Sequence, residues 1–227
     1  MLTGELAKRI HLSSTDTVLD IACGLGESAR LLAKNYGCSV LGLDLSKSLL
    51  RKARELRESE VEELVLGDGE ILPVRDDSFT VTISECSMCL IPEFGKGLRE
   101  IFRILRPHGR LGITDIATDG PLPLELEEIL AQFLCISNEV PWSDYPAIIK
   151  TEGFDHVEVI DESASLHKLL ETIKKRLLLA ELLTGVGKLQ VSRDMLERGK
   201  RLVFLAKAAV DEGRLRYAMI TAQKPAV

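Results

Sequence analysis

The sequence lacks any long apolar run, since no stretch approaches the roughly 18 residues that a membrane-spanning helix needs. Residues 1–5 also lack the basic region and the apolar core that begin a secretory signal peptide. We therefore expect a cytoplasmic protein with no membrane partner. The five cysteines are an odd number without regular spacing, which favours reduced thiols over a disulfide framework.

The sequence also lacks an excess of positive charge. It has 29 basic and 35 acidic residues, so its net charge of −6 repels a long polyanion, and we expect no nucleic-acid partner. The four histidines are scattered, and no set of four zinc ligands can be assembled, so we expect no bound metal. No internal repeat is present, and the 227 residues suffice for a single α/β domain, residues 1–227.

Short apolar segments alternate with helical patterns from residue 17 onward. One helical pattern places Ala29, Leu32, Ala33 and Tyr36 on a single face. The expected strands are residues 17–21, 39–44, 63–66, 79–84, 111–115, 156–160 and 216–221. This alternation predicts a doubly wound α/β fold, in which helices cover both faces of a parallel sheet.

Two helical segments interrupt the alternation. Residues 120–150 and 165–212 fall outside a predicted core of residues 17–118, 154–163 and 215–223. The second segment carries an apolar stripe beginning at Leu166, with basic residues on other faces. It can serve as a lid, as a homodimer surface, or as packing against the sheet.

Polar residues follow the predicted strands. They are Asp20, Asp44, Asp68, Ser84 with Glu85, and Asp115. Because parallel strands end at one edge of a sheet, and ligands of such sheets bind beyond that edge, we expect a binding site there.

The turn after the first strand fits a dinucleotide fingerprint. Residues 24–29 read Gly-Leu-Gly-Glu-Ser-Ala, and Asp44 follows where an acid accepts hydrogen bonds from ribose hydroxyls. This pattern alone also fits a nicotinamide cofactor. Asp20, however, places negative charge beside the turn, which favours a positively charged ligand such as S-adenosylmethionine over a pyrophosphate.

Residues 18–26, Val-Leu-Asp-Ile-Ala-Cys-Gly-Leu-Gly, resemble motif I of the class I (Rossmann-like) S-adenosylmethionine-dependent methyltransferases, type 11-like. Residues 67–79 resemble the adenine-binding segment of that family, and residues 105–111 resemble the turn before its fifth strand. The resemblance implies a mostly parallel, seven-stranded sheet with an antiparallel last strand, and helical insertions over the acceptor side. It also implies methyl transfer from S-adenosylmethionine to a small molecule, which leaves S-adenosylhomocysteine.

The resemblance implies a donor site. Gly24 and Gly26 would let the backbone approach the methionine part of the donor, Asp20 would hold its amino group, and Asp44 would bind the ribose. Asp68 and Gly69 would face the adenine. The remaining predicted donor-site residues are Ala22, Leu45, Glu70 and Ser84. Ala22 replaces a glycine common in the family, and we expect it to keep a negative φ in a slightly tighter turn.

The acceptor site is less specific in sequence, because an electrophilic methyl group requires alignment more than acid–base catalysis. Glu85 and Asp115 are candidates to orient or deprotonate the acceptor. Trp142 and Tyr145 are candidates to wall its pocket, with plain packing as the alternative.

Cys86 and Cys89 form a C-x-x-C pair near this side and can bind a soft metal or metalloid, with Cys135 as a third thiolate. In this the chain loosely resembles arsenite methyltransferases, although their longer motifs are absent. Alternatively, both cysteines are small buried apolar residues. A nicotinamide-dependent oxidoreductase and a non-catalytic S-adenosylmethionine-binding protein remain as alternative functions.

Overall fold

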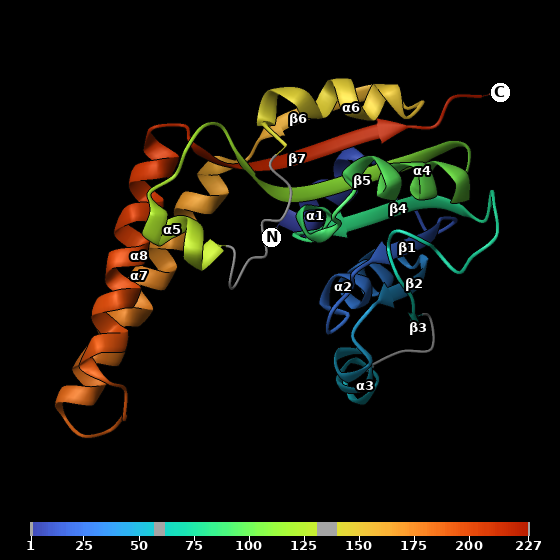
Figure 1. Cartoon of the computed structure of the whole chain (residues 1–227). Coiled ribbons are helices and arrows are strands. Elements are labelled where there is room, and N and C mark those ends of the chain that lie inside the picture. Colours follow the sequence, from blue (N-terminus) through green and yellow to red (C-terminus); the bar gives the residue numbers. More distant parts are fainter. Residues whose placement is uncertain (1, 57–61, 131–139, 227) are drawn as a thin grey trace.

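The computed structural model describes residues 2–56, 62–130 and 140–226. Within these ranges seven strands form one sheet in the order β3-β2-β1-β4-β5-β7-β6 (Figure 1). The strands are β1 (Thr17–Ile21), β2 (Ser39–Asp44), β3 (Glu62–Leu66), β4 (Phe79–Glu85), β5 (Leu105–Thr118), β6 (Asp155–Asp161) and β7 (Leu215–Gln223). The last strand, β7, runs antiparallel to both of its neighbours, while the pairs among β1 to β5 are parallel. The predicted fold is confirmed.

Two helix ends show how the sequence sets the bounds of the helices. Ser46 caps the helix after β2 by accepting a hydrogen bond from the Leu49 N–H at 3.3 Å, and Gly37, at φ 70°, ends the helix after β1. The α-helices are α1 (Leu2–Arg9), α2 (Glu27–Tyr36), α3 (Lys47–Glu55), α4 (Phe94–Ile104), α5 (Leu124–Ile129), α6 (Tyr145–Thr151), α7 (Ser163–Gly185) and α8 (Arg193–Asp211). Two short 3₁₀ helices are η1 (Met88–Leu90) and η3 (Trp142–Asp144).

Side chains alternate between the two faces of the sheet and build a core on each. In β1, Leu19 and Ile21 pack in a cluster with residues of α4 and α6, while Val18 packs with α1 and α2. All three side chains are almost completely buried, and each contributes about 1.5–3 kcal/mol through the hydrophobic effect. These two clusters hold the strand ends rigidly at one edge.

A third cluster joins α5, α7 and α8 to the ends of β5 and β7. In Figure 1 the antiparallel pair of α7 and α8 extends away from the sheet beside the carboxyl ends of the central strands. Both predicted helical segments contain helices here, but α6 packs on the sheet face beside α4 instead of covering the strand ends. Part of the predicted helical segment of residues 120–150 lies outside the described residues.

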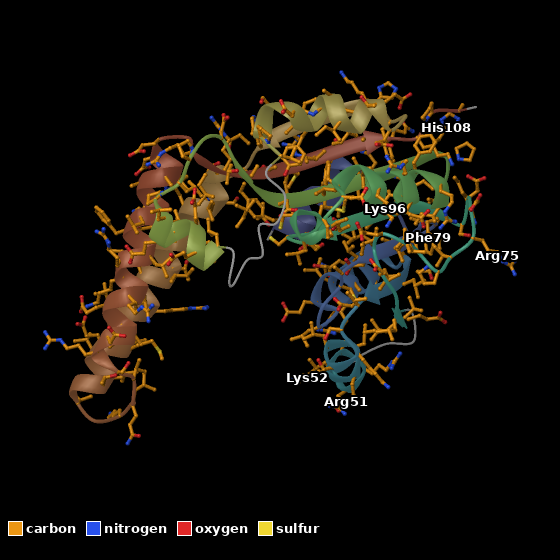
Figure 2. All side chains as sticks on the ribbon, viewed as in Figure 1. Arg51, Lys52, Arg75, Phe79, Lys96 and His108 are labelled. Atoms are coloured by element: carbon orange, nitrogen blue, oxygen red, sulfur yellow. The ribbon has the colours of Figure 1, made fainter. Side chains whose placement is uncertain are left out.

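The structure differs from prediction at the start of β5. The sequence predicts a turn at residues 105–111 and a strand over residues 111–115, yet β5 already begins at Leu105, opposite Phe79. The register then shifts, so that Arg110 lies opposite Val81 and the intervening residues bulge, with His108 at φ 62°. Figure 2 shows His108 at the end of the sheet opposite the helical hairpin, far from the strand ends that a ligand would approach.

Within the described ranges, none of the helices combines the length and apolarity that crossing a membrane requires.

Candidate functional site

A cavity of about 530 Å³ opens at the carboxyl ends of β1, β2 and β3, beside residues 86–92. Its size is within the range of about 300–1,000 Å³ typical of small-molecule sites. Seven predicted donor-site residues line it: Ala22, Gly24, Asp44, Leu45, Asp68, Gly69 and Glu70. The spacing of the sequence motifs therefore brings separate strand ends to one wall.

The glycine turn leaves open space at the cavity. Gly24 has φ 56°, and an added Cβ would meet no heavy atom within 4 Å. Glycine adopts this left-handed backbone conformation without steric cost, and the open space beside Gly24 can admit a ligand. Gly26, at φ 73°, begins α2 and supports the turn without lining the cavity.

The predicted negative φ of Ala22 is wrong: its φ is 56°. The Cys23 N–H donates to the Leu43 carbonyl oxygen at 2.9 Å, so the chain must turn across β2 directly after Ala22. A non-glycine residue in this conformation costs about 1 kcal/mol, which the surrounding structure offsets.

Asp44 fixes the glycine turn and keeps acceptor capacity. Its Oδ2 accepts a hydrogen bond from the Gly24 N–H at 2.8 Å, and its Oδ1 accepts one from the Ser46 N–H at 2.7 Å. A carboxylate offers roughly four acceptor positions, so two remain for neighbouring hydroxyl groups of a ligand. The carboxylate is therefore held in place before any ligand arrives.

The segment after β3 forms a further part of the cavity wall. Asp68 Oδ1 accepts a hydrogen bond from the Glu70 N–H at 2.9 Å, and Glu70 Oε2 lies 3.9 Å from Nζ of Lys96, which Figure 2 labels on α4. A Cβ on Gly69 would lie 3.2 Å from Ile91 Cδ1, so the absence of a side chain here avoids a tight contact with Ile91.

Three predicted donor-site residues lie near the cavity without lining it. Gly26 is one of them. Asp20 is only 2% exposed, and Ser84 is fully buried, with its Oγ 2.5 Å from the hydroxyl oxygen of Ser87, which does line the cavity.

The prediction missed eight residues of the wall: Ile21, Leu43, Leu49, Gly67, Ser87, Leu90, Ile91 and Pro92. Most are apolar, and only the position of their strand ends could have identified them.

The two candidate catalytic carboxylates lie on opposite faces of the sheet. Glu85 pairs with Thr114 in the register of β4 and β5, so the next residue, Asp115, points to the other side. Glu85 contacts α1 and α2: its Oε2 accepts hydrogen bonds from Thr3 Oγ1 at 2.9 Å and from Ser28 Oγ at 2.6 Å. Its Oε1 is buried and has no hydrogen-bond partner among the described residues. The two carboxylates therefore do not face one acceptor together.

Asp115 holds the 3₁₀ turn that borders the cavity. Its oxygens accept hydrogen bonds from the N–H groups of Cys89 at 2.7 Å and Ile116 at 2.9 Å, and it is 1% exposed. Burial raises the pKa of its carboxyl group. Asp115 does not line the cavity, so its proposed contact with an acceptor stays a prediction that this geometry does not favour.

The two cysteines of the C-x-x-C pair occupy different surroundings. Cys86 lines the cavity, and its Sγ lies 2.9 Å from Tyr217 Oη. Desolvation by the surrounding protein raises the pKa of its thiol to about 11, although the residue is partly exposed. Cys89 is 4% exposed, and burial raises the pKa of its thiol as well. Cys135 lies outside the described residues, within which no group of three or more His, Cys, Asp or Glu residues could hold a metal.

The two aromatic candidates also lie away from the cavity wall. Tyr145 is 3% exposed and packs edge-on against Phe94, with ring centroids 5.3 Å apart. Trp142 lies under the guanidinium of Arg216, whose Cζ is 5.6 Å from the ring centroid. In this geometry both contribute packing, and a contact with the acceptor stays a prediction.

Comparison with known proteins agrees with this geometry. The family model described as "Methyltransferase domain" matches residues 19–113, a range that contains all of the residues that line the cavity. Methyltransferase GfsG of Streptomyces halstedii is 35% identical over 71% of this chain, and an arsenite methyltransferase of Halobacterium salinarum is 32% identical over 66%. The chain belongs to the class I S-adenosylmethionine-dependent methyltransferases.

The methyltransferase fold extends over the complete chain. The structure of phosphoethanolamine N-methyltransferase 2 of Haemonchus contortus, in complex with S-adenosyl-L-methionine, superposes with a TM-score of 0.86 over 99% of this chain at 22% identity. This chain spans 52% of that protein, and 61% and 40% of the two relatives named above. The Haemonchus structure contains S-adenosyl-L-methionine, and S-adenosylmethionine is the methyl donor of the family.

Proposed function

We propose that this protein transfers a methyl group from S-adenosylmethionine to a small-molecule acceptor. The observation that carries the proposal is the cavity wall, where Asp44, already bonded to the Gly24 N–H, keeps acceptor positions free beside an open glycine turn. Asp68, Gly69 and Ile91, which line the same cavity, support a place for the adenine ring. These features match a donor with vicinal hydroxyls, a flat base and a positively charged methionine end.

Methyl transfer needs little chemistry from the side chains. A lone pair of the acceptor forms a bond to the methyl carbon, the carbon–sulfur bond breaks, and its electrons stay on the sulfur of S-adenosylhomocysteine. An acceptor proton, where there is one, passes to water or to the Glu85 carboxylate. The protein therefore acts chiefly by alignment and by exclusion of water.

Calorimetry with S-adenosylhomocysteine tests the donor site. Asp44→Ala removes two ribose acceptors and the anchor of the Gly24 turn, so we expect affinity to fall at least about thirtyfold, at roughly 1 kcal/mol for each of two hydrogen bonds. Asp119→Ala, an exposed carboxylate away from the cavity, is the matched control and should bind like the native protein. Equal affinity of both variants would contradict the assignment.

A soft acceptor, either a thiol or a metalloid such as As(III), is the second candidate. Cys86 on the cavity wall and the likeness to an arsenite methyltransferase support it. In this conformation only Cys86 of the pair faces the cavity, so capture by both thiols requires η1 to move. Turnover of As(III) that is lost in both Cys86→Ser and Cys89→Ser would support this candidate, and full activity in both would end it.

Turnover to S-adenosylhomocysteine distinguishes the remaining possibilities. A panel of thiols, phenols, amines, carboxylates and As(III) identifies the acceptor class. Binding of S-adenosylhomocysteine without turnover of any acceptor would favour a non-catalytic binding protein, whereas binding of NADH in its place would favour an oxidoreductase.

We also propose that a second copy of the chain covers the hairpin of α7 and α8. Its exposed face includes Leu178, Leu182 and Phe204, which are 45%, 68% and 64% exposed, beside a cavity of about 430 Å³. Residues 163–211 contain ten lysines and arginines against five acidic residues, while the rest of the chain contains nineteen basic and thirty acidic residues. A positively charged arm and a negatively charged body are complementary between copies.

A further inference from the structure

We infer that Tyr217 is a positioning residue of the acceptor site, because it holds the Cys86 sulfur on the cavity wall where the acceptor meets the donor. This inference rests on the proposed methyl transfer and adds a residue to it that no sequence motif indicates. Tyr217 lies 131 positions after Cys86, at the amino end of the antiparallel strand β7.

The antiparallel direction of β7 explains how Tyr217 reaches the site. Tyr217 pairs with Ile116 near the carboxyl end of β5, so its ring lies at the ligand edge of the sheet. Its Oη is 2.9 Å from Cys86 Sγ and 3.4 Å from Thr114 Oγ1. Met219, two residues further along β7, packs with α1 and α2, which places Tyr217 on the same face as Glu85.

Cys86 is held in an unusual conformation for this contact. Its φ is 52°, and its N–H donates to the Thr114 carbonyl oxygen at 2.7 Å. A left-handed backbone at a residue other than glycine is costly and occurs most often where function requires a particular direction of a side chain. Here the strained residue is the first one after β4, and its sulfur meets the phenol.

The surroundings keep the sulfur protonated. Tyr217 contacts it, and the negative charges of Asp115 and Glu85, on opposite faces of the sheet, add to the effect of desolvation in raising the pKa of the thiol. A neutral thiol is a weak nucleophile, so Cys86 can contact a bound acceptor without competing for the donor methyl group.

Tyr217 also connects Cys86 on the cavity wall to the helical hairpin of α7 and α8. Its backbone N–H donates to Ser163 Oγ at 3.2 Å, and its carbonyl oxygen accepts from the Glu162 N–H at 2.8 Å, both at the start of α7. Its side chain is 8% exposed within the cluster formed by α5, α7 and α8. The position of the hairpin therefore sets the position of the Cys86 sulfur.

Tyr217→Phe tests the inference, because it removes the hydroxyl and keeps the ring. The rate of alkylation of Cys86 by iodoacetamide is measured against pH by mass spectrometry of its peptide. The phenol stabilises the thiolate, so its loss should slow alkylation at fixed pH by about tenfold. Tyr36→Phe, whose hydroxyl lies 3.5 Å from the Gly4 carbonyl oxygen on α1, is the control and should not change the rate.

Kinetics with the acceptor found by the panel provide the second measurement. We expect Tyr217→Phe to raise KM for the acceptor severalfold with a smaller change in kcat, and to leave affinity for S-adenosylhomocysteine unchanged. The double variant with Cys86→Ala should raise KM no further, since the two residues act as a pair. An unchanged alkylation profile, or additive effects on KM, overturns the inference. Failure of the native protein to bind S-adenosylhomocysteine would instead overturn the proposed function, while the alkylation profile would still report on the pair.

Discussion

At the scale of single residues, Ala22 shows that a motif position and a backbone conformation are separate matters. The local sequence permits either sign of φ at this alanine. The sign is decided by a hydrogen bond to another strand, from the Cys23 N–H to the Leu43 carbonyl oxygen. Strain at this position is therefore a property of the assembled sheet.

Ala22→Gly should stabilise the protein. Glycine removes a strain of about 1 kcal/mol at φ 56° and adds flexibility to the unfolded chain, so we expect a net gain of about 0.5 kcal/mol in the free energy of unfolding. Urea denaturation provides the measurement. Ala29→Gly inside α2 is the matched control and should lose about 1 kcal/mol; an equal loss in both variants would show that Ala22 is unstrained.

Site residues that lie close together in the sequence, or in motifs of fixed spacing, could be predicted from the sequence. Gly24, Asp44 and Asp68 each follow a recognisable strand, and all three line the cavity. Tyr217 could not be predicted in the same way, because its contact with Cys86 depends on the direction and register of β7. Apolar wall residues such as Leu43 carry no chemical signal of their own.

At the scale of elements, the pairing of β4 with β5 decides what the strand-end carboxylates can do. The sequence shows Glu85 and Asp115 each at the end of a strand. Only the register shows that Glu85 lies beside Thr114, which turns Asp115 to the opposite face. We accordingly assign Asp115 to support of the turn at residues 88–90, beneath the cavity wall.

Asp16 links three strands near their amino ends, at the edge of the sheet that lies opposite the cavity. It precedes β1, accepts a hydrogen bond from Thr80 of β4 at 2.8 Å, and forms an ion pair with Arg110 of β5. Its Oδ2 also accepts from the Ser13 N–H at 2.8 Å. Burial by itself would raise the pKa of Asp16, but the hydrogen bonds from Thr80 and Ser13, together with Arg110, lower it below the usual value near 3.8.

Asp16→Asn should lower the free energy of unfolding at neutral pH by about 2 kcal/mol, because charged hydrogen bonds to three partners are lost. A lowered pKa in the folded state stabilises the protein above the unfolded pKa, and this contribution disappears as pH falls through the folded value. The difference between the native protein and the variant should therefore shrink below about pH 4. Thermal unfolding measured from pH 7 to pH 3 checks this, and a difference independent of pH would contradict the assignment.

At the scale of the whole molecule, the distribution of charge separates the hairpin from the rest. An arm with twice as many basic as acidic residues extends from a body in which acidic residues prevail (Figure 1). Like charges oppose a symmetric contact of one hairpin with another, so the arm of one copy is expected to meet the body of the next copy.

Sedimentation velocity tests this association. We expect a dimer at low ionic strength that dissociates at about 1 M salt, where the screening length falls to about 3 Å. Phe204→Glu on the hairpin should yield monomers, whereas Leu56→Glu, at an exposed apolar residue directly after α3, should leave the dimer intact. A protein that stays monomeric at low salt, or that binds anionic lipid vesicles instead, would contradict the proposed second copy.

The position of β7 between β5 and β6 has a consequence for synthesis. Chains leave the ribosome amino end first, and all of the residues that line the cavity lie within residues 21–92, so the five strands β1 to β5 can pair early. β6 must wait for β7, its sheet neighbour, and until then the edge of β5 stays open to unwanted pairing. The nascent chain thus completes its donor pocket first. Cys86 contacts the Tyr217 hydroxyl only after β7 has paired with β5.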